Sequence, residues 1–482
     1  MRRLFLVSLA LLALSLAGLA AVWHQRSVQT LGALDGLPPA DLAVRPANLH
    51  AVNVALEQYD SADLERALEQ LAGFGWLRQT FAWRAGAQPD WRTWDRLVEA
   101  ATGRGFRLIA VLADPAPAAP PEPAAFAEFA RAFGARYAGR IAAYQVWDEP
   151  NLSAAWGGSP AAAQYAALLQ EAYLALHAAD AGAHVLAAAL APTLETGPDN
   201  LSDLLFLQQL YDLGAAPYFD AAAGKPYGFY TGPDDRQAQA TLLNFSRFVL
   251  LRQVMERNDD GRKLLWGGNF GWNVRASPWG QATPDQQIAY TLRAFERAAQ
   301  EWPWAGPLAL ELYQPAAAPD DPRWGFALAD PAGQLTPLGR ALADPPAASA
   351  QPGHSAIPHP AAAFTGAWRF SDLGADIPEA YAGARVALRF QGSELALRVR
   401  RGDYRAYLYV IVDGQPANRL PRDERGAYLV LTSPDLKPEV SVIPVASGLD
   451  PALIHTAVIE PERGWGQWAL AGFTVGRRLP AG

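Results

Sequence analysis

The stretch Ala142-Ala143-Tyr144-Gln145-Val146-Trp147-Asp148-Glu149-Pro150-Asn151 carries most of the fold information in this chain. Its apolar first half predicts a buried β-strand, and Pro150 stops that strand directly after the acidic pair. Where neighbouring strands run parallel, their carboxyl ends open onto one face, and a carboxylate there is a candidate site residue. Asp148 and Glu149 are therefore candidates if the rest of the chain supplies further parallel strands.

Further apolar runs of β type alternate with longer helical patterns between residues 48 and 343. The expected strands are 50–56, 76–81, 107–113, 142–146, 184–189, 219–223, 263–267 and 307–312. Strands alternating with helices over about 300 residues predict an α/β fold, a closed (β/α)8 TIM barrel. The alternative is an open doubly wound sheet, which is disfavoured because no Gly-rich phosphate turn follows the first strand.

Two helix starts are marked in the sequence of this region. Ser159-Pro160 and Thr283-Pro284 each place a hydroxyl at a candidate N-cap, directly before a proline in the first turn. Gln286 adds the partner that completes a capping box at the second start. We therefore expect helices to begin at both positions.

A second domain is predicted after the barrel. Residues 344–363 are rich in Pro and Ala and predict a linker. Over 364–479, short runs alternate apolar and polar residues between turns, which is typical of a β-sandwich or jelly roll. The expected strands are 384–390, 394–399, 404–412, 427–431, 439–445, 455–459 and 468–475. Asp413-Gly414 predicts a hairpin turn between two of them.

The N-terminal residues predict export. Arg2 and Arg3 precede an apolar run over 4–23, so residues 1–24 have the pattern of a signal peptide. The run is also long enough for an uncleaved membrane anchor. Residues 25–47 predict a linker to the first domain. We therefore expect an extracellular or cell-surface protein, secreted or anchored in the membrane.

The composition excludes several classes of site. The chain has no Cys, so it has no disulfide, thiolate metal site or Cys nucleophile. Its net charge is −8 and its basic residues are scattered, so no nucleic-acid partner is expected. The seven His lack metal-ligand spacing, the acidic turn 372–376 is a weak calcium candidate, and no phosphate loop or serine elbow occurs. We expect neither a metal nor a cofactor.

Around Glu149 the sequence resembles the clan A glycoside hydrolases, a group of retaining (β/α)8 enzymes whose fourth strand ends in Trp-Asn-Glu-Pro-Asn or a close variant. The resemblance extends over residues 50–343, although only this motif is specific. It implies that Glu149 is the acid/base catalyst and that Arg78 orders the nucleophile. Asp148 stands where the family has asparagine, and its carboxylate can still accept a hydrogen bond from a sugar hydroxyl.

Two strand ends depart from the family pattern. The family nucleophile is a glutamate at the end of the seventh strand, whereas this chain has Asn269 in the string Trp266-Gly267-Gly268-Asn269-Phe270-Gly271-Trp272. An amide cannot form the glycosyl ester of a retaining mechanism, so the usual double displacement is not available. Lys225 stands where relatives commonly have histidine. A barrel can keep its shape while its reaction changes.

Three alternatives remain for the barrel. Glu311, an acid inside the apolar eighth strand, is a candidate second catalytic carboxylate, and Glu57 and Asp114 are weaker candidates. Alternatively, substrate or water supplies the nucleophile and Asn269 orients it. The third alternative is a catalytically inactive, membrane-tethered carbohydrate-binding protein. Our leading hypothesis is an exported glycoside hydrolase-like protein that acts on O-glycosidic bonds of an extracellular oligo- or polysaccharide, with Glu149 and Glu311 as catalytic residues.

Aromatic side chains at strand ends are expected to line the carbohydrate site. The strongest candidates are Trp147, Tyr227 and Trp272, and the others are Trp83, Trp156, Tyr230, Trp279 and Tyr313. The C-terminal domain loosely resembles the galactose-binding jelly rolls of carbohydrate enzymes, with Trp368 and Trp465 among its features. Carbohydrate binding by that domain is one alternative, and a packing or spacer role is the other.

Overall fold

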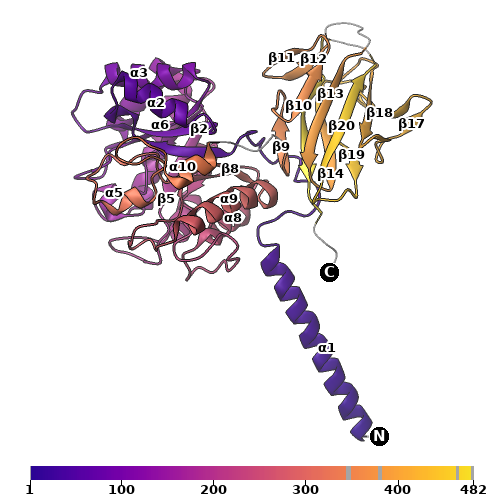
Figure 1. Cartoon of the computed structure of the whole chain (residues 1–482), viewed down its shortest axis with the longest axis horizontal. Helices are drawn as coiled ribbons and strands as arrows, with labels where there is room; N and C mark the ends of the chain where they lie inside the picture. The colour runs from indigo at the N-terminus through magenta and orange to yellow at the C-terminus, as the bar shows by residue number, and fades with distance from the viewer. Residues whose placement is uncertain (1, 344–348, 378–382, 463–465, 479–482) are drawn as a thin grey trace.

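The computed structural model describes residues 2–343, 349–377, 383–462 and 466–478. Figure 1 shows a helix-wrapped barrel and a β-sandwich, with helix α1 (Arg2–Gln29) extending away from both. In the part of the chain that the structure describes, no helix is both long enough and apolar enough to cross a membrane. The export signal therefore stays a prediction.

The first domain is a closed barrel of eight parallel strands in the order β1 to β8. The strands are β1 His50–Val54, β2 Trp76–Ala82, β3 Arg107–Ala113, β4 Ala143–Val146, β5 Val185–Leu190, β6 Ala221–Gly224, β7 Leu265–Phe270 and β8 Ala305–Leu310. The α-helices are α2 Ser61–Gln70, α3 Trp91–Gly103, α4 Pro123–Tyr137, α5 Ser153–Trp156, α6 Ala162–Ala179, α7 Asp203–Asp212, α8 Phe248–Arg257, α9 Pro284–Glu301 and α10 Pro337–Leu342. The closed sheet confirms the predicted TIM barrel and excludes the open sheet.

The strands lie close to their predicted positions because buried parallel strands read as continuous apolar runs. Every residue of β5, β6, β7 and β8 is buried. The main difference is at β7, which continues to Phe270, so that Asn269 lies inside the strand.

One of the two predicted helix starts is confirmed. Thr283 and Gln286 form the capping box at the start of α9, each bonding to the other's backbone N–H. The start at Ser159-Pro160 is wrong, because α6 begins only at Ala162 and its first turn has no side-chain cap.

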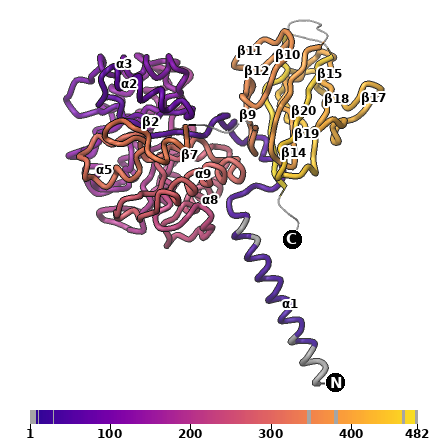
Figure 2. Tube along the Cα trace, viewed as in Figure 1, coloured from indigo at the N-terminus to yellow at the C-terminus, as the bar shows by residue number. Residues whose placement is uncertain are grey.

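The second domain is a sandwich of two antiparallel sheets, as predicted. One sheet has the order β10-β13-β20-β15-β18-β17 with β16 beside β15, and the other has the order β11-β12-β21-β14-β19 with β9 beside β21. The strands are β9 Gly353–Ala356, β10 Ala362–Thr365, β11 Arg369–Ser371, β12 Gly374–Asp376, β13 Arg385–Gln391, β14 Glu394–Arg401, β15 Tyr407–Val412, β16 Gln415–Pro416, β17 Arg422–Asp423, β18 Gly426–Val430, β19 Glu439–Ser447, β20 Ile454–Pro461 and β21 Leu470–Gly476. Figure 2 follows the same path along the chain.

Two details of this domain bear on the sequence predictions. Asp413 and Gly414 have φ angles of 51° and 77° between β15 and β16, which confirms the hairpin turn. The predicted linker 344–363 instead contains β9, which pairs with β21 and carries the fully buried His354. This strand is short and lacks an alternating pattern, so no periodic signal marks it.

The N-terminal segment 30–47, which we call the strap, is held against both domains. The guanidinium of Arg45 donates to the backbone oxygen of Trp302 in the barrel at 3.2 Å. The backbone N–H of Arg45 donates to the backbone oxygen of His354 in the sandwich at 2.8 Å. The His354 Nε2 in turn lies 2.8 Å from the backbone oxygen of Pro39 in the strap. The strap therefore differs from the plain linker that its composition predicts.

Candidate active site

The carboxyl ends of four strands bring charged and polar side chains together at one mouth of the barrel. Asp148 and Glu149 follow β4, Lys225 follows β6, Asn269 lies near the end of β7, and Glu311 follows β8. The side chains of Asp148 and Glu149 keep 28% of their surface exposed. The predicted acids thus lie at one accessible site.

The backbone at the end of β4 is strained. Trp147 and Glu149 adopt φ angles of 66° and 50°, in the left-handed region that disfavours side chains. Each such residue costs about 1–3 kcal/mol and persists only where the surroundings hold it. The Trp147 N–H donates to the Leu112 oxygen at 2.9 Å and the Glu149 N–H to the Ala189 oxygen at 3.2 Å. The two neighbouring strands therefore fix the direction in which Glu149 points.

Arg78 organises the floor of the mouth. Its guanidinium, which is 5% exposed, donates to Asp148 Oδ1 at 2.7 Å and to Asn53 Oδ1 at 2.6 Å. It also donates to Gln145 Oε1 at 3.1 Å and to Asn269 Oδ1 at 3.2 Å. A buried guanidinium requires this many partners because its donors have lost water. Arg78 thus connects Asp148, which follows β4, to Asn269 in β7.

Lys225 bridges the two acids that follow β4. Its ammonium donates to Asp148 Oδ2 at 2.9 Å and to Glu149 Oε1 at 2.8 Å. Burial lowers the pKa of Lys225, but the charges of these carboxylates outweigh it and the pKa is raised. Burial likewise acts to raise the pKa of Asp148, but Arg78 and Lys225 outweigh it and the pKa is lowered. The lysine and Asp148 are therefore both charged at neutral pH.

Glu311 lies in a different environment. It hydrogen-bonds through Oε2 to the Tyr227 hydroxyl and to Asn269 Nδ2, the latter at 3.0 Å. Burial raises the pKa of Glu311, and the charge of Glu149 raises it further, against a partial offset from these hydrogen bonds and Lys225. Burial and the charge of Glu311 in turn raise the pKa of Tyr227 well above its usual value. The pKa of the Glu311 carboxyl is thus raised, whereas that of Asp148 is lowered.

The two weaker acid candidates do not join this group. Glu57 is exposed and accepts a hydrogen bond from Gln79 Nε2 at 2.7 Å. Asp114 accepts the backbone N–H of Ala116 at 3.0 Å and lies 3.9 Å from Arg84. Glu311 is therefore the second carboxylate that the structure brings to Glu149.

Two of the three strongest candidates for a groove wall are instead buried, as are the weaker candidates Trp156 and Tyr313. Trp147 is 0% exposed, within ring-contact distance of Phe126 and Trp156. Trp272 is 1% exposed and donates through Nε1 to the Thr231 oxygen at 2.7 Å. Both tryptophans pack in the interior, contrary to the prediction of an accessible wall, and they support the end of β4 and the loop that follows β6.

Other aromatic residues provide the accessible rings. Tyr230 is 74% exposed in the loop after β6, and Trp279 is 38% exposed in the loop after β7. Ring contacts connect Trp279 to Phe326 at 6.2 Å and Phe326 to Tyr227 at 6.3 Å. The Trp279 ring is thus connected through Phe326 to Tyr227, which hydrogen-bonds to Glu311. Both exposed residues ranked below Trp147 and Trp272 among the sequence-based candidates, because a sequence does not reveal burial.

Sequence reasoning missed three residues of the site. Asn53 and Gln145 bind Arg78, and Lys225 was noticed only as a departure from the family. The signal that would have found the first two is a polar residue inside an otherwise apolar strand, which marks a side chain turned into the barrel.

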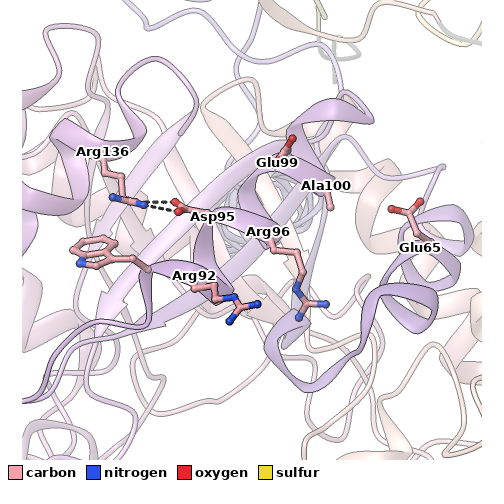
Figure 3. Close-up of a pocket in the computed structure, with 8 residues that line it drawn as sticks. Glu65, Arg92, Asp95, Arg96, Glu99, Ala100 and Arg136 are labelled. Atoms are coloured by element: carbon pink, nitrogen blue, oxygen red, sulfur yellow. Dashed lines mark hydrogen bonds and ion pairs between the residues drawn. The ribbon is translucent and has the colours of Figure 1, made fainter.

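A separate hollow of about 740 Å³ lies on the outer helices and not at the mouth. It is shown in Figure 3, and its lining residues are Glu65, Trp91, Arg92, Asp95, Arg96, Glu99, Ala100 and Arg136. Arg136 forms an ion pair with Asp95 and lies over the Trp91 ring at 5.2 Å. Among the described residues, no group of three or more His, Asp or Glu side chains is placed to hold a metal ion.

Of the two tryptophans singled out in the C-terminal domain, Trp368 lies within the described residues. Trp368 packs against Phe364 with ring centroids 5.2 Å apart and donates to the Thr365 oxygen at 3.0 Å. Trp465 lies outside the described residues. Carbohydrate binding by this domain therefore stays a prediction.

No protein-family model and no curated protein matches the chain. Several solved structures do match the chain. A family 39 glycoside hydrolase from Bacteroides cellulosilyticus WH2 is 15% identical, with 83% of this chain and 81% of that chain covered and a TM-score of 0.49. A glucosidase from Croceicoccus marinus is 12% identical, covering 89% and 97%, with a TM-score of 0.49. Endo-glycoceramidase II from Rhodococcus sp. is 15% identical, covering 88% and 99%, with a TM-score of 0.44. Glycoside hydrolases are thus among the solved proteins to which the fold of this chain is similar.

Proposed function

We propose that this chain hydrolyses O-glycosidic bonds with Glu149 and Glu311 as its carboxylate pair. The observation that carries the proposal is that two acids share one barrel mouth in different electrostatic environments. Glu149 contacts the ammonium of Lys225, whereas Glu311 contacts the neutral groups of Tyr227 and Asn269. Glycoside hydrolysis needs one protonated and one ionised carboxyl group at the same bond, and such a difference in environment provides them.

The replacement of the family nucleophile by asparagine is compatible with this proposal. Asn269 receives a hydrogen bond from Arg78 at its oxygen and donates one to Glu311 from its nitrogen. The amide therefore connects the buried guanidinium to a carboxylate on the neighbouring strand. In this arrangement the second acid stands at the end of β8, one strand away from its position in the family.

The proposed substrate is an extracellular oligo- or polysaccharide. The exposed rings of Tyr230 and Trp279 support this, because flat aromatic faces suit the apolar faces of sugar rings. Export is part of the proposal and rests on Arg2, Arg3 and the apolar run that follows them. Fractionation of cells that express the chain, followed by sequencing of its N-terminus, tests export and cleavage together.

Hydrolysis of a glycoside panel by the full chain tests the proposed reaction. The panel contains 2,4-dinitrophenyl and phenyl glycosides of common sugars together with plant and bacterial polysaccharides. We expect turnover of at least one polysaccharide or phenyl glycoside, and a loss of about 100-fold or more in Glu149→Gln and in Glu311→Gln. Glu57→Gln, an exposed acid outside the group, is the matched control and should retain activity. Sugar binding without turnover would instead favour the inactive carbohydrate-binding barrel.

A further inference from the structure

Lys225 constrains what Glu149 can do. The ammonium is 5% exposed and lies 2.8 Å from Glu149 Oε1 and 2.9 Å from Asp148 Oδ2, while Arg78 holds the other Asp148 oxygen. An ammonium has only donors, so its contact with Glu149 is a charge-assisted one as long as this carboxylate keeps its negative charge, whereas no ion pair to Glu311 is found among the described residues. If Asp148 lost its contact with Lys225, the buried ammonium would keep only one carboxylate partner, which is unfavourable. The geometry therefore pairs Glu149 with a buried cation.

Glu311 has the opposite arrangement. Tyr227 and Asn269 both hydrogen-bond to Oε2, and no residue in the described part of the chain hydrogen-bonds to Oε1. Oε1 can therefore carry a proton without losing a contact. The charged groups that act on Glu311 are Lys225 and Glu149, and Glu311 itself acts on Arg323. Burial raises the pKa of Glu311, which agrees with a proton on this group.

We propose that the two acids have exchanged the roles that the clan A resemblance implies. Glu311 donates a proton from Oε1 to the leaving oxygen, and Glu149, held by Lys225, is the base. The glycosidic C–O bond breaks with its electron pair on the leaving oxygen, which takes the Glu311 proton. Water forms the new bond to the anomeric carbon and gives its proton to Glu149. When the products leave, that proton passes to solvent and Glu311 takes up another.

This inference rests on the proposed function and makes Lys225 a positioning residue. Lys225→Met removes the ammonium, so Glu149 can take up a proton and the low-pH limb of kcat/KM should move to higher pH. Lys225→Arg keeps a cation and should restore most of the wild-type pH profile. A purely structural role for Lys225 would lower activity at every pH without moving that limb, and this result would overturn the role assigned to Lys225.

Leaving-group dependence tests the exchange itself. A 2,4-dinitrophenyl group leaves without a proton, whereas a phenyl group needs one, so a variant that lacks the acid keeps activity on the first only. We expect Glu311→Gln to remain within about 10-fold of wild type on the 2,4-dinitrophenyl glycoside and to lose about 100-fold or more on the phenyl glycoside. Glu149→Gln should lose activity on both. The reverse ranking of the two variants overturns the inference.

An infrared measurement separates failure of this inference from failure of the proposed function. A protonated carboxyl gives a carbonyl stretching band in difference spectra that an ionised one lacks. We expect the band at neutral pH in wild type and in Glu149→Gln, and its loss in Glu311→Gln. A chain that shows this band but hydrolyses nothing would refute the proposed function and leave the charge arrangement intact. A missing band, or one lost in Glu149→Gln instead, overturns the inference.

Discussion

The two ends of the barrel are made by the same eight strands, but they hold their buried positive charges differently. At the mouth, Arg78 and Lys225 face carboxylates that remain 28% exposed. At the opposite end, the guanidinium of Arg45 in the strap donates to two backbone oxygens, those of Ala299 and Trp302, both at 3.2 Å, and forms no ion pair with a described residue. Burial lowers the pKa of Arg45 to about 10.

This difference indicates that the buried cation at one end of the barrel stabilises the fold, whereas the charged groups at the mouth suit a reaction. Ala299 and Trp302 lie at the C-terminal end of α9, where backbone oxygens lack helical partners and carry partial negative charge, so Arg45 caps that helix. A cavity of about 170 Å³ beside the strap is lined mainly by apolar and aromatic side chains, including Trp76 and Trp266. The mouth instead combines like-charged acids with left-handed backbone, a costly arrangement that suits a reaction. Substitutions at the end of the barrel near the strap are therefore expected to affect folding alone. Substitutions at the mouth are expected to affect both folding and activity.

The largest expected effect is at Arg78. Arg78→Met leaves Asp148 with Lys225 as its remaining cation and removes the partner of Asn53, Gln145 and Asn269. Breaking a buried ion pair from one side costs about 3–5 kcal/mol, so we expect a loss of unfolding free energy in this range. Urea unfolding followed by tryptophan fluorescence measures it.

A double variant shows whether that loss comes from the unpaired charge. Arg78→Met combined with Asp148→Asn removes both charges and should be less destabilised than the sum of the single variants. A loss below about 1 kcal/mol in Arg78→Met would break the comparison, because the mouth would then not depend on its ion pair.

A smaller loss of unfolding free energy is expected at Arg45, at the opposite end of the barrel. Arg45→Met removes two charge-assisted hydrogen bonds to the end of α9, so we expect a loss of about 1.5–3 kcal/mol. Activity measured well below the unfolding temperature should not change, because Arg45 lies at the other end of the strands. Arg45→Lys keeps the charge and should recover part of the stability. A change in the pH profile of hydrolysis in Arg45→Met would show that the two ends are coupled.

The sequence predicted the barrel well because its signals are local. Each strand is a short apolar run, and the motif that ends at Glu149 marks the face where strand ends open. The start of α6 shows the limit: Ser159-Pro160 has the right residues, but the chain enters the helix only at Ala162. The strap shows another limit, because Arg45 is fixed by backbone oxygens more than 250 positions away and no periodic pattern records such contacts.

The sequence pointed to the acids that meet at the barrel mouth but not to the side chains that bind them. Glu149 and Glu311 stand out as carboxylates at the ends of apolar runs, so their residue types made them candidates. Their partners depend on the register of β7 against β8, which shifts twice along the pair and brings Asn269 next to Glu311. Lys225 reaches Glu149 from 76 positions away. Such contacts follow from the closed sheet and not from any local pattern.

The smallest expected effect concerns the pH dependence of the unfolding free energy, which should have opposite signs for His50 at one end of the barrel and Glu311 at the other. Burial lowers the pKa of His50, at the start of β1, to about 4. Its folded pKa lies below the unfolded value near 6.5, so its stabilising contribution is present above that value and is lost as pH falls toward 4. His50→Leu should therefore lose about 1 kcal/mol less unfolding free energy than wild type between pH 7 and pH 5.5. Glu311 has a raised folded pKa, so its contribution is lost as pH rises above the unfolded value of about 4.3, and Glu311→Gln should remove that loss instead. Urea midpoints of the two variants across pH 4–9 measure both effects, and parallel shifts in the two variants would contradict the assignment of opposite charge preferences to the two ends.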